Sequence, residues 1–107
     1  MAWANDIICT NQSMASDVDS DIVDMKNIYM VAVQCVYTGT PAGVLQMEFS
    51  NNGVDWISPT GAQKNLVGDP GSFFIDYTDT ACRWMRVNYY VDSGSGTLNV
   101  WFSSKGV

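Results

Sequence analysis

Apolar and polar side chains alternate along most of this chain, and the three- or four-residue spacing of an amphipathic helix is hard to find. Alternation of this kind places successive side chains on opposite faces of an extended strand. Clusters of glycine, asparagine, serine and proline interrupt it at intervals of roughly 8–12 residues, the spacing of turns between short strands. The pattern predicts an all-β fold: a single antiparallel β-sandwich, jelly-roll-like, with about eight strands.

Three segments carry the pattern most clearly. Residues 27–37 are largely apolar on both faces, so we expect a central strand that is covered on both sides. Residues 44–50 have one apolar face, which predicts a strand with one dry and one wet side. The glycine-rich stretch 92–96 predicts a hairpin that joins residues 83–91 to a last strand at 97–103. The two expected faces of residues 83–91 are Trp84, Arg86, Asn88 and Tyr90 against Met85, Val87, Tyr89 and Val91.

The leading segment is the most acidic part of the chain. We expect residues 1–21 to form an extended acidic arm with one or two short edge strands, and residues 22–107 to form the β-sandwich domain. Asp17, Asp19 and Asp21 have a spacing that resembles the start of a calcium loop. Such a loop has glycine at its sixth position and glutamate at its twelfth, which this sequence lacks, so a solvated arm is the preferred interpretation.

Composition limits the classes of partner. A chain of 107 residues has the length of one domain, and a hydrophobic content of 47% predicts a folded core. Charged residues make up only 15%, below the ~25% of typical globular domains, which suggests that partners cover some of the surface. The net charge of -6 argues against nucleic acid and anionic membranes, because no basic stripe is present. No leader peptide or membrane-spanning run is visible, so we expect synthesis in a host cytoplasm and no membrane insertion.

The inventory of reactive side chains is small. The sequence has no histidine, which excludes imidazole metal sites, Ser-His-Asp triads and Cys-His pairs within this chain. Cys9, Cys35 and Cys82 show no CxxC spacing, and we expect buried free thiols, with one disulfide plus a free thiol as the alternative. We expect a non-enzymatic protein without a catalytic residue, cofactor or metal.

The stretch 49–57 reads FSNNGVDWI and joins turn chemistry to a tryptophan. Asn-Gly is the strongest short hairpin signal, because both central residues of a type I′ turn need positive φ. Residues 51–53 therefore predict a hairpin turn. We expect Trp56 to pack at the sandwich edge or against another subunit, and the alternative is a ring that stacks on a sugar. The candidate contacts for a partner or a glycan are Trp56, Asn51, Asn52, Asp55 and Arg86.

Other large side chains have both structural and functional interpretations. Trp84 and Trp101 stand on the two strands of the last expected hairpin, and we expect both in the core, because a two-layer sandwich needs bulky inward residues. For Arg86 the preferred interpretation is an ion pair with Asp76 or Asp79. The alternative is an acidic group of a partner or ligand.

Several motifs follow one another in a familiar order. They are IVDM at 22–25, VQCVYTGTPAGVLQ at 33–46, SNNGVDW at 50–56, RVNY at 86–89, SGSGTLNV at 93–100 and a closing KG at 105–106. This order resembles a group of small β-sandwich structural proteins of bacteriophage virions, whose chains carry TGTPxG, SNDGxxW and a terminal GSGxLxVxxxxKG. The resemblance covers residues 22–106 and implies the sandwich fold and a structural role in the virion.

Residues 50–56 also resemble the SxDGxxW segment of discoidin-type carbohydrate-binding domains, with Asn52 where those domains usually have Asp. The chain is shorter than such domains and lacks their paired terminal cysteines. We therefore expect a virion structural protein, either a capsid decoration or cement protein or a spike component. It would be a homo-oligomer located in the virion that also binds phage capsid or other virion proteins. The alternative is a discoidin-like module that binds host-surface glycans.

Overall fold

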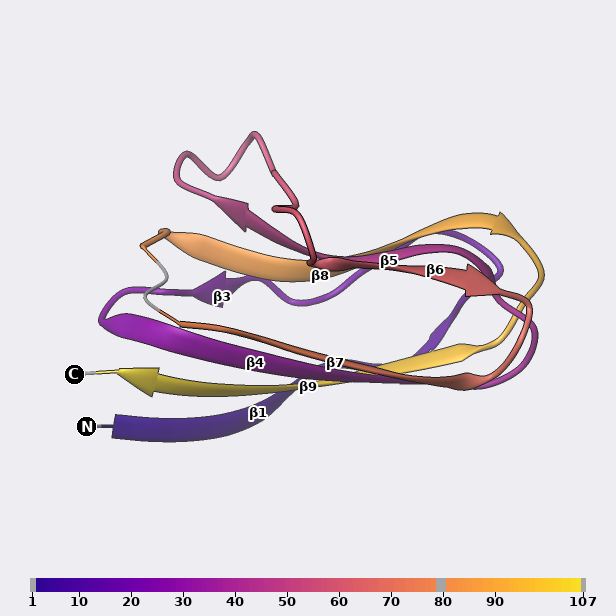
Figure 1. Cartoon of the computed structure of the whole chain (residues 1–107), viewed down its shortest axis with the longest axis horizontal. Helices are drawn as coiled ribbons and strands as arrows, with labels where there is room; N and C mark the ends of the chain where they lie inside the picture. The colour runs from indigo at the N-terminus through magenta and orange to yellow at the C-terminus, as the bar shows by residue number, and fades with distance from the viewer. Residues whose placement is uncertain (1, 79–80, 107) are drawn as a thin grey trace.

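The computed structural model of the protein describes residues 2–78 and 81–106, which form two stacked β-sheets (Figure 1). Nine strands and no helix occur in these ranges, so the predicted all-β sandwich is confirmed. Consequently, nothing in the described ranges could cross a membrane as a helix. The strands are β1 (Ala2–Ser13), β2 (Val18–Asp19), β3 (Val23–Asp24), β4 (Ile28–Tyr37), β5 (Ala42–Ser50), β6 (Gln63–Val67), β7 (Gly71–Tyr77), β8 (Trp84–Ser93) and β9 (Thr97–Gly106).

The nine strands are divided between two antiparallel sheets. One sheet, which we call the lower sheet from its place in Figure 1, has the order β1-β9-β4-β7. The other, the upper sheet, has the order β2-β8-β5-β6, with β3 also paired to β8. The antiparallel pairs are nested along the chain: β1 with β9, β2 and β3 with β8, β4 with β7, and β5 with β6. Most consecutive strands therefore lie in opposite sheets.

The predicted hairpin at residues 92–96 is wrong. β8 belongs to the upper sheet and β9 to the lower sheet, so this stretch carries the chain from one sheet to the other. Residues 38–41 make another crossing, between β4 and β5. Glycine-rich turn chemistry reverses the chain in both kinds of connection, so the local sequence does not distinguish a hairpin from a crossing.

The two crossings are packed against each other. The amide groups of Thr38 and Thr40 donate hydrogen bonds to the carbonyls of Thr97 and Ser95, at 3.0 and 2.7 Å. Gly94 has a φ of +80°, and a Cβ there would stand 1.9 Å from the Thr40 carbonyl oxygen. Only glycine fits such a close approach of two backbones. This contact is why two of the motifs named above, 38–41 and 93–96, are rich in small residues.

The predicted arm at residues 1–21 is an integral part of the sandwich in the structure, so the boundary at residue 22 does not separate two units. β1 pairs with β9 over nearly its whole length, and β2 pairs with β8. The aspartates of this segment are exposed, while the apolar residues between them reach the core. The buried residues are Ile8, Cys9, Met14 and Val18.

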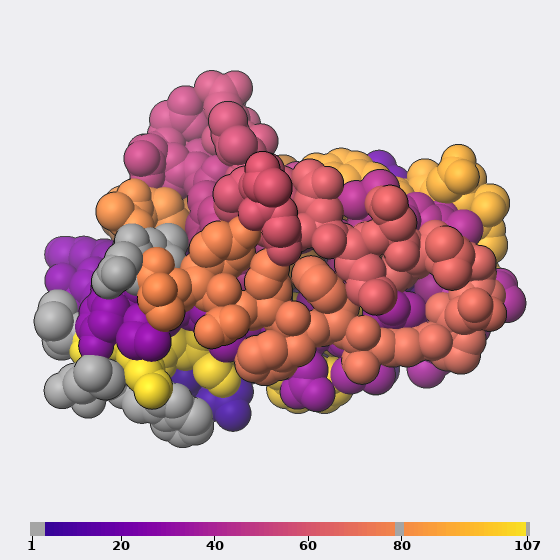
Figure 2. Space-filling view, in the orientation of Figure 1, coloured from indigo at the N-terminus to yellow at the C-terminus, as the bar shows by residue number. Residues whose placement is uncertain are grey.

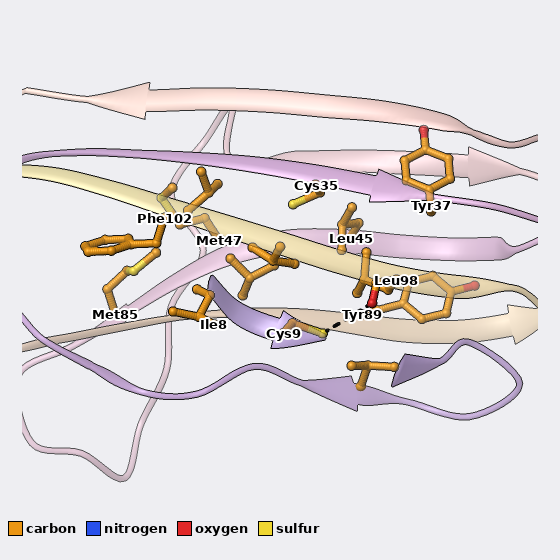
Figure 3. Packing of buried hydrophobic residues seen from close by; sticks show 14 of the residues in the cluster. Ile8, Cys9, Cys35, Tyr37, Leu45, Met47, Met85, Tyr89, Leu98 and Phe102 are labelled. Carbon is orange, nitrogen blue, oxygen red and sulfur yellow. Dashed lines mark hydrogen bonds between the residues drawn. The ribbon is translucent and has the colours of Figure 1, made fainter. Parts of the chain in front are cut away.

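The core fills the space between the sheets (Figure 3). Met85, Val87 and Tyr89 of β8 are at most 2% exposed, so of the two faces expected for residues 83–91 this one points into the core. β5 contributes Leu45 and Met47, both fully buried. Their partners across the core come from the lower sheet and include Val33, Cys35, Leu98, Val100 and Phe102.

The three cysteines are free thiols, as predicted. Cys9 and Cys35 are buried, and each lies opposite Val100 of β9, from different sides. Two strand spacings, about 9.6 Å, separate their backbones, beyond the ~7 Å Cα separation that a disulfide allows. The Cys9 thiol instead donates to the Leu98 carbonyl oxygen, with Sγ 3.7 Å away (Figure 3).

Candidate functional site

The residues named from the sequence fall in two neighbouring places. Asn51, Asn52 and Asp55 belong to the loop between β5 and β6, which rises above the upper sheet in Figure 1 and forms a lobe in Figure 2. Trp56 ends this part of the loop and lies against Arg86 on the outer face of the upper sheet. The structure thus joins Trp56 to Arg86, and joins the other three residues to one another.

Side-chain oxygens hold the loop together. The Ser50 hydroxyl oxygen accepts the amide protons of Asn52 and Gly53, at 3.3 and 2.9 Å. The Asn52 side-chain oxygen accepts those of Val54 and Asp55, both at 2.9 Å. Serine and asparagine commonly stabilise turns in this way. The sequence SNNGVD therefore specifies a turn that is preorganised by its own side chains.

The predicted type I′ turn is wrong, although the chain does reverse here. Gly53 has a φ of 75°, whereas Asn52 does not have a positive φ, so only one central position meets the requirement. β5 ends at Ser50, and the chain returns through a bridge between Phe49 and Ile57. Their two amide-to-carbonyl hydrogen bonds measure 2.9 and 3.0 Å. The reversal is a longer loop, within which the Asn52 side-chain oxygen accepts amide protons.

Asn51, Asn52 and Asp55 line a hollow of about 520 Å³. Their polar groups already have partners within the chain. The Asn51 side-chain oxygen accepts the Arg83 amide proton at 2.9 Å, and Asn52 Nδ2 donates to Asp55 Oδ2 at 2.9 Å. The first bond attaches the loop to the residue before β8, and the second lies within the loop, so all three side chains already have a structural task.

Trp56 covers the guanidinium group of Arg86, whose central carbon lies 4.2 Å from the Trp56 ring centroid. Such stacking of a cation on an indole is favourable. Arg86 Nε also donates to Glu48 Oε1 at 2.8 Å, and Glu48 stands directly opposite Arg86 in the pairing of β5 with β8. The Glu48 side chain is only 3% exposed and that of Arg86 20%. Ring, guanidinium and carboxylate form one layered cluster.

The Glu48 carboxylate is the centre of this cluster. Its Oε2 accepts hydrogen bonds from the Tyr90 hydroxyl, at 2.7 Å, and from the Gln46 amide. The Asn88 amide donates to the same hydroxyl at 3.3 Å. Burial, and then the hydrogen bond to Glu48, raise the pKa of Tyr90 above its usual value. A buried carboxylate requires such donors, and here the chain supplies all of them.

Sequence reasoning named Trp56 and Arg86 but missed Glu48, Gln46 and Tyr90. The alternation places Glu48 on a face expected to be exposed to water. Nothing in the linear pattern indicates that Arg86, and Trp56 from the following loop, will cover its carboxylate. The register between β5 and β8 was the missing information.

Two other expectations are wrong. Arg86 does not pair with Asp76, which lies on β7 in the lower sheet, and Asp79 lies outside the described residues. Trp84 and Trp101 are not in the core, because both occupy outward positions: Trp84 is half-buried beneath the Arg83 guanidinium, and Trp101 is 39% exposed.

The outer face of the lower sheet carries exposed rings and small side chains instead of a buried ion pair. We call this outer face the neutral face. One row of side chains runs across all four strands, since Ile7 lies opposite Trp101, Trp101 opposite Gln34, and Gln34 opposite Phe74. Phe74 is 66% exposed, and Ile7 and Trp101 are each 39% exposed. The adjacent row consists of Asn5, Ser103, Ala32 and Asp76.

Small side chains leave two shallow hollows on the neutral face, of about 210 and 400 Å³. Ala32, Phe74 and Ser103 border both. Among the described outward positions of this sheet, Asp76 and Lys105 are the charged ones, so the face has no net charge although the chain carries -6. Exposed rings, small residues and the lack of net charge make this face suited to contact with another protein.

No family model matches the chain, and no curated protein sequence matches it. Solved structures share its fold. The SPBc2 prophage-derived protein YomS superposes with a TM-score of 0.63 over 97% of this chain and 96% of that one, at 7% identity. The PBSX exported protein XepA superposes with a TM-score of 0.70 over 97% of this chain and 37% of that one, at 17% identity.

A chitosan-binding module from a chitosanase/glucanase of Paenibacillus sp. IK-5 also superposes, with a TM-score of 0.53 over 95% of this chain and 76% of that one, at 17% identity. Likeness at these identities concerns the fold. At that level the predicted resemblance to small β-sandwich proteins of phages is confirmed, and carbohydrate-binding modules share the same architecture.

Proposed function

We propose that this protein is a non-enzymatic structural protein of a bacteriophage virion, a decoration or cement protein or a spike component. It assembles with itself and with capsid or other virion proteins. The neutral face carries this proposal, because aromatic side chains are enriched and charges are depleted at the centres of protein interfaces. The fold likeness to two prophage proteins supports the virion location.

The edge formed by β1 is poorly suited to pairing with another chain, which favours a contact through a face. β1 is an edge strand interrupted by two register shifts and by Asn11, which has a φ of 47°. Such irregularities hinder the addition of another strand. In the upper sheet, the edge strand β6 has only five residues. Assembly through an arm at residues 1–21 is not part of the proposal, since β1 and β2 pair within the chain.

Mass spectrometry of phage particles tests this function. Particles are purified on a density gradient from a lysate of the strain that encodes the chain. We expect the chain to co-purify with the particles in many copies, on the scale of other structural proteins. Its absence from intact particles, with the chain present in the soluble lysate, would overturn the proposal.

A carbohydrate-binding module is the second candidate. The observation that favours it is the half-buried Trp56 ring, which shares the outer face of the upper sheet with Tyr90, 38% exposed, and with amide side chains such as Gln46 and Gln63. Rings stack on sugars, and amides bind their hydroxyl groups. A glycan array that includes chitooligosaccharides tests it. Binding that Trp56→Ala abolishes and Val67→Ala preserves would support this candidate, and an array without signal would exclude it.

A further inference from the structure

The outward side of β4 is unusually apolar for an exposed surface. Met30, Ala32 and Val36 lie on it, and the sequence predicts a strand that is covered on both sides. The inward side is buried as expected, with Val31, Cys35 and their neighbours in the core. The outward side is not covered by any strand that the structure describes. The expectation of cover on both sides is therefore wrong for the described residues, and an apolar row of β4 is left open to a partner.

The neutral face carries both a projection and depressions. Phe74 is 66% exposed and stands at the border of both hollows, whose other shared lining residues, Ala32 and Ser103, are small. A surface that meets its own copy by two-fold symmetry must contain both a knob and a matching depression, because the same patch serves both partners. This face has both within one sheet.

Charge favours the neutral face over most other surfaces of the chain for a contact between two copies. The molecule carries a net charge of -6, so two copies repel each other through most pairs of surfaces. At the described outward positions of the neutral face the acid Asp76 is balanced by the base Lys105, and both line the smaller hollow. A contact through this face brings no net charge together.

The size of the face also matches a second copy. β4 and β9 have 10 residues each. Four strands ~4.8 Å apart, rising ~3.3 Å per residue, present a face of roughly 19 by 33 Å, on the order of 600 Å² in projection. Projecting side chains raise the accessible area towards the ~800 Å² per partner that stable interfaces bury.

We infer that a second copy of this chain packs face to face on the neutral face, with Phe74 of each copy over the hollows of the other. This inference rests on the proposed self-assembly and names the surface that performs it. Two substitutions separate the knob from the depression: Phe74→Asp removes the ring and adds a charge, and Ala32→Arg fills the hollows. The matched control is Val67→Asp, which changes another exposed apolar residue, 79% exposed, on the edge strand of the other sheet.

The experiment is sedimentation velocity on the full chain, from roughly 1 to 100 µM, which covers even the weak, micromolar end of the affinities of interfaces of this size. We expect the wild type and Val67→Asp to form assemblies of at least two chains, and Phe74→Asp and Ala32→Arg to sediment as single chains. Circular dichroism and thermal unfolding check that each variant is folded. If Ala32→Arg fails to fold, Phe74→Asp alone tests the inference. The Phe74 side chain is already exposed, so its replacement should not disturb folding.

A wild type that is a single chain at every concentration would overturn the inference. Assemblies that persist in Phe74→Asp would overturn it as well and place self-contact elsewhere. The first result would also remove self-assembly from the proposed function. Neither result bears on whether the chain is found in purified particles, so failure of this inference is distinguishable from failure of the virion role.

Discussion

At the scale of single residues, the Glu48 carboxylate is the group whose environment is most costly to disturb. It is buried beneath Arg86, Tyr90 and Gln46, and the Arg86 guanidinium is in turn covered by Trp56. A charge taken out of water depends on its counter-charge. This cluster therefore explains why a loop with turn chemistry ends in a tryptophan: the ring completes the cover over an ion pair.

Replacing Arg86 by methionine should destabilise the protein by about 3–5 kcal/mol, because it leaves the Glu48 charge buried without its partner. Urea unfolding measures the change. The double variant Glu48→Gln with Arg86→Met removes both charges and should recover most of the lost stability. A double variant as unstable as the single one would contradict this account, since it would show that packing and not charge dominates.

The buried thiols make a second prediction, in pH. Burial first, and then the charge of Asp21, raise the pKa of Cys9 to about 11. Burial, with a smaller contribution from Cys9, raises the pKa of Cys35 to about 12. An unfolded thiol loses its proton near pH 9. The stability that these groups contribute is therefore complete below pH 9 and is lost as the pH rises towards 11 and 12.

Each thiol should lower the unfolding free energy by about 1.4 kcal/mol per pH unit above pH 9, until its own folded-state pKa is reached. Urea unfolding from pH 8 to 11 measures the slope. Tyrosines with raised pKa values add to this slope, so the comparison is with Cys35→Ala. The slope of this variant should be shallower by the contribution of one thiol, about 1.4 kcal/mol per pH unit. Equal slopes in the two proteins would contradict the assignment to Cys35.

At the scale of elements, the decisive feature is the contact between the two crossings at residues 38–41 and 93–96. Each would serve equally well as a hairpin turn if read alone. Their backbones approach so closely that Gly94 and Gly96 leave no room for a Cβ, with Thr40 and Thr38 carbonyl oxygens in its place. The glycines therefore hold two sheets together at one end of the sandwich rather than two strands of one sheet.

Gly94→Ala should cost about 3 kcal/mol or more, because the new Cβ adds a backbone collision to the strain of a positive φ. Gly61→Ala is the matched control: its φ is +89°, but nothing lies within 4 Å of the added Cβ. It should cost only the conformational strain, about 1 kcal/mol. Thermal unfolding of both variants measures the difference. Similar losses would indicate that the crossings can separate without cost.

At the scale of the whole molecule, we expect the first 21 residues to be required for the fold. They provide β1, β2 and the core residues Ile8, Cys9, Met14 and Val18. Burial of an aliphatic side chain contributes about 1.5–3 kcal/mol, so the set approaches the ~5–15 kcal/mol stability of a typical domain.

A chain that begins at Ile22 should therefore lack a cooperative unfolding transition, as measured by circular dichroism on heating. The comparison is the full chain with Asp17→Asn and Asp19→Asn, which keeps both strands and should unfold cooperatively. A truncated chain with the full-length transition would show that β1 and β2 are an appendage after all.

The sequence by itself determined the fold class, the strands at residues 27–37, 44–50, 83–91 and 97–103 and the two faces of residues 83–91, because these depend on a period of two that is local to each strand. It also named Trp56 and Arg86, since rings and guanidinium groups near turns are few. Which strands pair, and so the cover over Glu48, the role of β1 and the outward position of Trp101, were decided only by the tertiary structure. The physical reason is that nested pairing joins residues far apart in the chain, and an alternating pattern is compatible with many such pairings.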